Sequence, residues 1–366
     1  MRIVWVVPGP LDQRTGGYLY DRLIVERLRA RADEVHVLVV GAAGHLTEPL
    51  AHARAEQLAR EAAELRPDAV VGDALASETL GPLFVQLRGS TARALLVHHL
   101  TSWEGEALDG QARRAEEARA LLESDAVIAT SSRTASRIAA EFGRVADIVV
   151  PGADRLPRPP RASRGAADEP APVVFLFVGN ILPRKRLPLL LDALDDLAAP
   201  HAHLRVVGDP SRDADHARLV DARIARSAYL SRHVTRLGAV DDDALAAELG
   251  RADALVLPSS LEGYGMVLTE ALRAGVPVLA ASAWAPPELG AAPDLALLFD
   301  DQQGLLAHLR RFAFRPSLRA RMSVAAEAYA PSLPTWGGAS TAFREALRRA
   351  SAATTGGRGP SSGRSS

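Results

Sequence analysis

The sequence predicts an α/β protein built from two doubly wound parallel sheets. Three observations support this: short apolar runs alternate with helical segments, the alternation occurs twice, and a Pro- and Arg-rich segment separates the two series. Strands that alternate with helices pair in parallel, because each helix carries the chain back across the sheet. At 366 residues the chain is also longer than one hydrophobic core usually supports. We therefore expect two domains of similar architecture.

The first series predicts an N-terminal domain at residues 1–154. Residues 2–8 form a β-branched run that ends in Pro and Gly, which predicts a buried strand followed by a loop. A helix is then expected to open at Gly16 and Gly17. Further strands are predicted at 34–41, 68–74, 92–99, 125–132 and 146–152.

The second series predicts a C-terminal domain at residues 173–330. Residues 155–172 are rich in Pro and Arg and lack periodicity, which is typical of a linker. Residues 331–352 are expected to form a C-terminal helix that could pack back toward the N-terminal domain. A disordered Gly/Ser-rich tail is predicted at 353–366. The predicted strands of this domain are 173–180, 203–209, 234–240, 252–259 and 275–280.

Composition excludes several classes of function. The formal net charge is −1, so no overall field attracts nucleic acid or an anionic membrane. The absence of cysteine excludes disulfides, thiolate nucleophiles and thiolate metal sites. The apolar run at the N-terminus is too short for the core of a signal peptide, and no stretch has the length of a transmembrane helix. We expect a soluble, cytoplasmic protein, with peripheral association at a membrane left open.

Two residue types that are otherwise missing occur together in one short segment. Every basic residue is arginine except Lys185, and Asn180 is the only asparagine in the chain. Both lie in the segment 179–186, whereas Lys and Asn are absent from the rest of the chain, as a codon bias of the genome would produce. A lysine ammonium is a compact point charge that arginine does not copy where it must meet a phosphate. This segment therefore predicts a demanding binding site.

The stretch 257–280 combines two carboxylates with two glycines in an apolar setting. The pattern predicts a buried strand, a loop that carries Glu262, and an amphipathic helix that carries Glu270 in its first turns. Gly263 and Gly265 would let backbone N–H groups approach a ligand, and the helix N-terminus favours an anion. Carboxylates beside that anion would accept hydrogen bonds from hydroxyl groups, as a nucleotide sugar requires. The alternative is that Glu262 caps the helix and Glu270 faces solvent.

The segment "EGYGMVLTE" resembles the glutamate-x7-glutamate signature of the family-4 retaining glycosyltransferases. The resemblance continues through 234–280, through "VVPGAD", through the glycines at 16–17 and through "FLFVGNILPRKRLPLLLDAL". It covers nearly the whole chain apart from the linker and the tail. It implies the GT-B fold, in which two Rossmann-like domains face each other across a central cleft, and a hexosyl-transferring activity.

The resemblance also implies roles for individual residues. Glu262 would hold hydroxyl groups of the donor sugar, and Glu270 would hold those of the ribose. Lys185 takes the place of the family's phosphate-binding lysine. The family's usual arginine is replaced by Asn180, which would hydrogen-bond instead, while Arg184 would supply the missing charge. The loop and helix start that would contact the donor are Gly263, Tyr264, Gly265, Met266 and Val267, with backbone N–H groups from Tyr264 onward meeting the diphosphate.

The N-terminal domain offers a histidine pair at the end of a predicted strand. His98 and His99 project to opposite sides, so at most one is expected to face the cleft. The family places a functional histidine here, and the Thr and Ser that follow favour His99 over His98. Gly16 and Gly17 would let the N-terminal loop approach the diphosphate or the acceptor. Glu104 is interpreted as a loop charge rather than an acceptor ligand.

No catalytic metal or cofactor is expected, and the nucleoside-diphosphate sugar would be a co-substrate. The acidic run at 241–243 precedes a helix, so it is interpreted as a helix cap that complements the helix dipole.

The predicted function is transfer of a sugar, with retention of configuration, to an unidentified acceptor hydroxyl on a small molecule, a glycan or a lipid-linked carrier. Three alternatives remain at this point: a non-hydrolysing sugar-nucleotide epimerase, an NAD-dependent oxidoreductase and a non-catalytic sugar-nucleotide-binding protein. The glycines of the first domain do not match G-x-G-x-x-G, which disfavours the oxidoreductase.

Overall fold

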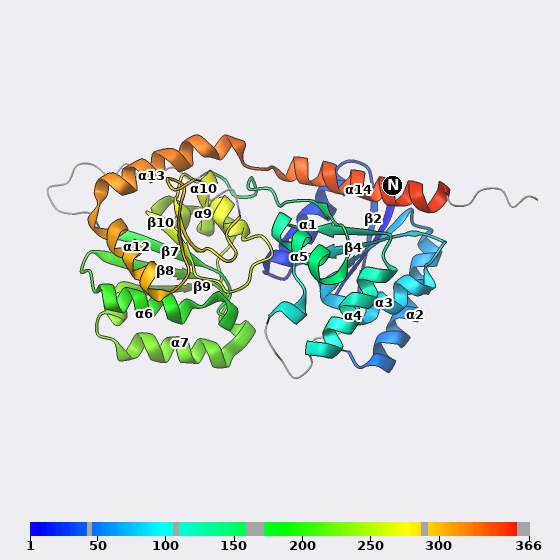
Figure 1. Cartoon of the computed structure of the whole chain (residues 1–366), viewed down its shortest axis with the longest axis horizontal. Helices are drawn as coiled ribbons and strands as arrows, with labels where there is room; N and C mark the ends of the chain where they lie inside the picture. The colour runs from blue at the N-terminus through cyan, green and yellow to red at the C-terminus, as the bar shows by residue number, and fades with distance from the viewer. Residues whose placement is uncertain (42–45, 105–109, 159–171, 287–291, 357–366) are drawn as a thin grey trace, which may run out of the picture. The chain divides into compact units, whose positions relative to one another are not determined.

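The computed structural model describes residues 1–41, 46–104, 110–158, 172–286 and 292–356, and it divides the chain into two compact units (Figure 1). The first unit comprises Met1–Pro151 together with the C-terminal segment that begins at Trp336, and the second comprises Gly152–Thr335. The chain therefore passes from the first unit to the second and returns. Its first crossing comes three residues earlier than the expected boundary at residue 154.

The first unit contains a six-stranded parallel sheet in the order β2-β1-β3-β4-β5-β6. All six predicted strands are present, although the last is reduced to two residues. The elements of this unit are β1 (Arg2–Val7), α1 (Gly16–Arg29), β2 (Glu34–Val39), α2 (Glu48–Leu65), β3 (Ala69–Asp73), η1 (Ala74–Ala76), α3 (Ser77–Gln86), β4 (Ala92–Val97), η2 (Thr101–Trp103), α4 (Gly110–Glu123), β5 (Ala126–Ala129), α5 (Ser132–Phe142), β6 (Asp147–Ile148) and α14 (Trp336–Gly356).

The second unit contains a parallel sheet in the order β12-β11-β10-β7-β8-β9. The prediction of two doubly wound sheets is thus confirmed, and only β12 was missed. The elements are β7 (Val173–Val178), η3 (Pro183–Lys185), α6 (Leu187–Leu197), β8 (Ala202–Val207), η4 (Ser211–Asp213), α7 (Ala214–Arg226), α8 (Leu230–His233), β9 (Val234–Gly238), α9 (Asp242–Arg251), β10 (Ala254–Leu257), α10 (Met266–Arg273), β11 (Val278–Ala281), β12 (Ala296–Phe299), α12 (Gln302–Phe314), α13 (Pro316–Tyr329) and η5 (Ala330–Ser332).

The start of the predicted linker belongs to the core of the second unit. Ala153 and Leu156 are buried among its apolar side chains, and the N–H of Ala153 donates to the carbonyl of Pro334 at 2.8 Å. Residues 155–158 are therefore fixed in place, while the rest of the predicted linker, from 159 to 171, lies outside the described residues. Of the predicted tail, 353–356 continue α14 and 357–366 lie outside the described residues.

Helix α14 is an integral part of the first unit, where it contacts α1, β4 and β5. The ring of Phe343 stacks on Trp5 of β1 with centroids 5.0 Å apart, and both side chains are fully buried. Trp336 packs edge-on against Tyr20 at 5.6 Å. Arg344 donates to both oxygens of Asp33, at 2.6 and 2.9 Å. The last helix of the chain thus completes the core of the first unit.

Phe343→Ala should destabilise the first unit by about 3–5 kcal/mol, because it opens a cavity in a close-packed core. The matched control is Phe314→Ala, since Phe314 is 55% exposed. Urea unfolding followed by the fluorescence of the buried tryptophans measures the difference. Equal effects of the two substitutions would show that α14 does not complete this core.

Candidate functional site

In the second unit, the predicted residues Asn180, Lys185 and Glu262 follow two adjacent strands, β7 and β10. β10, β7 and β8 are neighbours in the sheet, so the loops after their carboxyl ends lie at one edge. Asn180 and Lys185 follow β7, and Glu262 follows β10. The structure brings Lys185 and Glu262 into direct contact, although 77 residues separate them in the sequence.

Lys185 and Glu262 form an ion pair between the Nζ and Oε1 atoms. Their side chains are 13% and 11% exposed, so the pair is largely withdrawn from water. Burial would raise the pKa of Glu262, but the positive charges of Lys185 and Arg184 outweigh it and hold that pKa below its ordinary value. Glu262 is therefore a carboxylate at neutral pH, suited to accept hydrogen bonds and not to donate a proton.

Arg184 fastens the two loops to each other. Its Nη1 donates to the carbonyl of Leu261 at 3.3 Å, and its own carbonyl accepts from the N–H of Ser260 at 2.8 Å. The loop after β7 and the loop after β10 are thus held in register next to the ion pair. This arrangement places two cationic side chains at the same strand ends.

Because Gly208 has no side chain, the loop after β8 can approach the loop after β7 closely. A Cβ at Gly208 would lie 1.9 Å from the carbonyl oxygen of Gly179, which backbone cannot tolerate. Asn180 joins the same loops, since its Oδ1 accepts from the N–H of Asp209 at 3.4 Å. Asn180 therefore has a structural hydrogen bond, and its expected role toward phosphate stays a prediction.

Helix α10 begins directly after the glycine turn. Gly265 occupies the N-cap position with a φ of +82°, a conformation that favours glycine, and no side chain caps the helix. The backbone N–H groups at the start of α10 are thus free of a side-chain cap, as an anion site requires. Glu262 precedes this turn and does not cap the helix, so that alternative is wrong.

Glu270 is buried within α10 and paired with Arg155, a contact that was not anticipated. Nε and Nη2 of Arg155 lie 3.0 and 2.9 Å from the same atom, Oε1 of Glu270, while Nη1 binds Asp242. Glu270 is only 5% exposed, so the alternative that it faces solvent is wrong. Burial raises its pKa, and Arg155 opposes that rise. The hydrogen bond from Nε and the ion-pair contact from Nη2 both go to Oε1, and none of the hydrogen bonds found among the described residues goes to Oε2.

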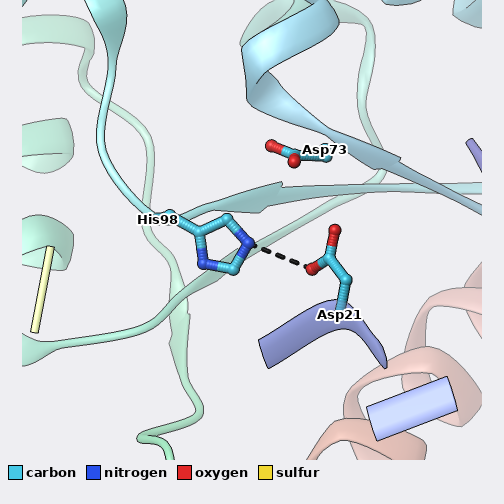
Figure 2. Close-up of side chains that lie close together, drawn as sticks. All are labelled: Asp21, Asp73 and His98. Atoms are coloured by element: carbon cyan, nitrogen blue, oxygen red, sulfur yellow. Dashed lines mark hydrogen bonds and ion pairs between the residues drawn. The ribbon is translucent and has the colours of Figure 1, made fainter. Parts of the chain in front are cut away.

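In the first unit, His98 lies in a buried cluster with Asp21 and Asp73 (Figure 2). Nε2 of His98 lies 3.0 Å from Oδ1 of Asp21, and Asp21 raises the pKa of His98 despite burial. A Cβ on Gly17 would lie 3.1 Å from the His98 ring, so glycine at this position leaves room for the imidazole. Gly17, one of the two predicted glycines, thus lies against the ring of His98, one of the two predicted histidines.

His99 has a separate environment. Its Nε2 lies 2.7 Å from Oε1 of Glu104, and the two side chains are 14% and 42% exposed. The two histidines thus have different partners, and their projection to opposite sides stays a prediction. The preference for His99 over His98 as the cleft-facing residue stays a prediction.

The acidic run at 241–243 behaves as a helix entry. Asp241 is the N-cap of α9 and accepts from the N–H of Ala244 at 2.8 Å, which confirms the interpretation as a cap. Within the described residues, one group of three carboxyl or imidazole side chains could surround a cation: Asp21, Asp73 and His98, whose ligand-type atoms lie within 4.8 Å of one another. The expectation of no catalytic metal stays a prediction.

Three polar residues of the two sites were missed in the sequence: Asp21, Asp73 and Arg155. Asp73 ends a buried strand, which is a position where functional side chains of parallel sheets occur. Asp21 lies on the buried face of α1, where a carboxylate is unusual enough to be a signal. Arg155 carried no signal, because it stands among other arginines of the Pro- and Arg-rich segment.

Comparison with known proteins finds a family match that lies within the second unit. Residues 162–329 match the model of the family described as glycosyl transferases group 1. The D-inositol 3-phosphate glycosyltransferase of Rhodococcus opacus (strain B4) is 29% identical over 280 residues, 72% of this chain and 62% of the relative. The protein of the same name from Streptomyces avermitilis is 32% identical over 253 residues, 62% of this chain and 52% of the relative. This chain thus spans little more than half the length of these relatives.

Solved structures agree on the fold over the whole chain. Sucrose-phosphate synthase from Thermosynechococcus elongatus has a TM-score of 0.79 at 19% identity and covers 96% of this chain and 99% of its own. Anabaena HepE in complex with UDP and glucose has a TM-score of 0.73 at 18% identity, with 95% and 100% covered. These likenesses establish the GT-B fold. No helix in the described part of the chain is long and apolar enough to cross a membrane.

Arg155→Met should destabilise the second unit by about 3–5 kcal/mol near neutral pH, because the buried Glu270 carboxylate loses its cation. The loss should shrink as the pH falls toward the ordinary Glu pKa of 4.5, since Glu270 in the variant folds as the neutral acid. Urea unfolding at several pH values measures both effects.

The matched control is Asp242→Asn, which removes the other partner of Arg155. The Asp242 side chain is 55% exposed, so its loss should cost about 0–1 kcal/mol. A pH-independent penalty in Arg155→Met, or an equal penalty in Asp242→Asn, would contradict the assignment of Arg155 to Glu270.

Proposed function

Residues 162–329 match the glycosyl transferases group 1 family in a chain with the GT-B fold, and from this premise we propose that the protein is a retaining glycosyltransferase. The donor is a nucleoside-diphosphate sugar, and the product is a glycoside formed on an acceptor hydroxyl. The observation that carries the proposal is the convergence of Lys185, Arg184, Glu262 and the uncapped start of α10 at neighbouring strand ends of the second unit.

Lys185, Arg184 and the start of α10 suit the diphosphate. The rate of sugar transfer depends on how well the charge that develops on the leaving group is stabilised. An ammonium, a guanidinium and free backbone N–H groups each provide such stabilisation without a proton transfer. Upon donor binding, Lys185 would contact both Glu262 and a phosphate oxygen. Structures of HepE with UDP and with UDP-glucose support a donor of this class for the fold.

Glu262 and Glu270 suit the hydroxyl groups of the donor. Glu262 is ionised, and the positive charge of Lys185 compensates its negative charge. It is therefore suited to orient the sugar and is a weak base. Glu270 has one oxygen anchored by Arg155 and presents the other for ribose hydroxyls. With no strong base among these residues, the acceptor proton would pass to a phosphate oxygen of the donor, which favours attack on the face from which the diphosphate leaves and therefore retention.

The comparisons favour a transferase over the earlier alternatives. The family and the relatives reported above carry glycosyltransferase names, and an epimerase or an oxidoreductase has no corresponding support. The inositol phosphate named in those relatives is one acceptor to include in a screen, together with lipid-linked and glycan acceptors.

Incubation of the purified chain with a panel of nucleoside-diphosphate sugars and acceptors tests the proposal. The expected result is release of nucleoside diphosphate with formation of a glycoside whose anomeric proton coupling matches that of the donor. Lys185→Met should lower kcat/KM by about 100-fold or more, because the leaving diphosphate loses a charge contact.

Arg212→Met is the matched control, since Arg212 lies on η4, is paired with Asp209 and takes no part in the Lys185–Glu262 pair. It should retain transfer within about twofold, the size expected for a surface pair. Donor epimerisation without acceptor, or a product of inverted configuration, would contradict the proposal.

A further inference from the structure

Asp21, Asp73 and His98 come together from three elements of the first unit. Asp73 ends β3 and His98 follows the adjacent strand β4, while Asp21 points toward both from α1 (Figure 2). Asp21 and Asp73 are 0% exposed and His98 is 7% exposed. Three titratable groups thus share one dry site, where an uncompensated charge is costly.

The hydrogen bonds of the cluster leave two carboxyl oxygens unsatisfied. Oδ1 of Asp21 accepts from Nε2 of His98 at 3.0 Å, and Oδ1 of Asp73 accepts from the N–H of Leu75 at 3.0 Å. The Oδ2 atoms of both aspartates are buried and have no partner among the described residues. Ligand-type atoms of Asp21, Asp73 and His98 lie within 4.8 Å of one another, so a proton on one carboxyl group would reduce the repulsion between the two aspartates.

Charge balance favours the same proton. Two ionised aspartates beside one imidazolium would leave a net charge of −1 in the site, whereas one added proton makes the cluster neutral. The other titratable groups that act on it are Tyr18 and Tyr20 of α1, which are neutral at ordinary pH. The hydroxyl of Tyr20 donates to the carbonyl of Val149 at 2.9 Å and is not available to the carboxylates.

The ionisation behaviour of the groups agrees with the geometry. Burial, together with the negative charge of Asp21, raises the pKa of Asp73 to about 7. Burial lowers the pKa of His98, but the charge and hydrogen bond of Asp21 outweigh it, so that the pKa of His98 is raised.

We propose that Asp21 and Asp73 share one proton and together hold His98 as an imidazolium whose Nδ1–H is a fixed, charged hydrogen-bond donor. Nε2 is used on Asp21, and Figure 2 shows Nδ1 on the side of the ring away from both carboxylates. Asp21 and Asp73 are positioning residues for this donor. The idea that this Nδ1–H donates to an anionic or hydroxyl group during sugar transfer rests on the proposed function. The protonation state of the cluster is independent of that function.

A divalent cation would neutralise the same two carboxylates, so it is the alternative to exclude. The hydrogen bond from Nε2 to Asp21 uses the nitrogen that faces the carboxylates and leaves it without a lone pair for a metal. Addition of Mg²⁺, Mn²⁺ or Zn²⁺ should therefore leave the thermal midpoint unchanged. A rise in the wild-type protein that is lost in Asp73→Asn would overturn the shared proton in favour of a cation site.

Asp73→Asn and Asp21→Asn form a matched pair of isosteric variants. In Asp73→Asn the new side-chain amide replaces a protonated carboxyl and still donates to Asp21, so the protonation constant of His98 should stay close to that of the wild type. Asp21→Asn removes the anion that faces Nε2, and the protonation constant of His98 should fall by about tenfold or more. Nitrogen-15 NMR of labelled histidines, with His98 identified by His98→Gln, measures both. An equal fall in the two variants would show that both carboxylates are ionised and would overturn the proposal.

The dependence of stability on pH provides a second test that needs only Asp73→Asn. Between the ordinary Asp pKa of 3.8 and about 7, native wild-type protein holds a proton that the unfolded chain has released. The unfolding constant of the wild type should therefore rise, relative to the variant, by about tenfold per pH unit across this window. Parallel pH profiles would overturn the shared proton.

Neither measurement requires a sugar donor, so failure of the proposed function leaves both results interpretable. If transfer is observed, Asp21→Asn should lower kcat with little change in the donor KM. An unchanged kcat in Asp21→Asn would overturn the donor role of His98.

Discussion

The sites of both units depend on one constraint: a carboxylate withdrawn from water must have its charge balanced nearby. Glu262 meets this constraint through Lys185, and Glu270 meets it through Arg155. The remaining pair, Asp21 and Asp73, faces a single histidine, which is why a shared proton completes the balance. Each neighbouring cation also limits what its carboxylate can do. A carboxylate whose negative charge is compensated can orient hydroxyl groups but has little capacity as an acid or a base.

The parallel sheets explain why these groups can be assembled from distant parts of the sequence. Adjacent strands end at the same edge, so Asp73 and His98 meet after β3 and β4, and Lys185 and Glu262 meet after β7 and β10. Only glycine at position 208 lets the loops after β7 and β8 approach so closely. In the proposed reaction, the second unit supplies the diphosphate and hydroxyl contacts, while within the first unit the charge of His98 is set by its buried neighbours.

The fold and part of the site could be predicted from the sequence because their signals are local. The alternation of apolar runs with helices locates every described strand except β12, and the isolated Lys185 and the two glutamates pointed to the segments that form the candidate site of the second unit. The missed contacts are long-range: Arg155 meets Glu270 across 115 residues, and Asp21 meets His98 across 77. Such pairings follow from how helices pack on the sheets, and no spacing in the sequence encodes them. The same reason hid the early crossing into the second unit at Gly152.

Calorimetric titration of the full chain with UDP, GDP, ADP, dTDP and NAD⁺ tests the central claim most directly, because it asks whether the second unit holds a nucleoside diphosphate. The account predicts saturable binding of at least one nucleoside diphosphate by the wild type and a loss of that binding in Lys185→Met. Binding of NAD⁺ alone, or nucleoside diphosphate binding that is indifferent to Lys185, would contradict it.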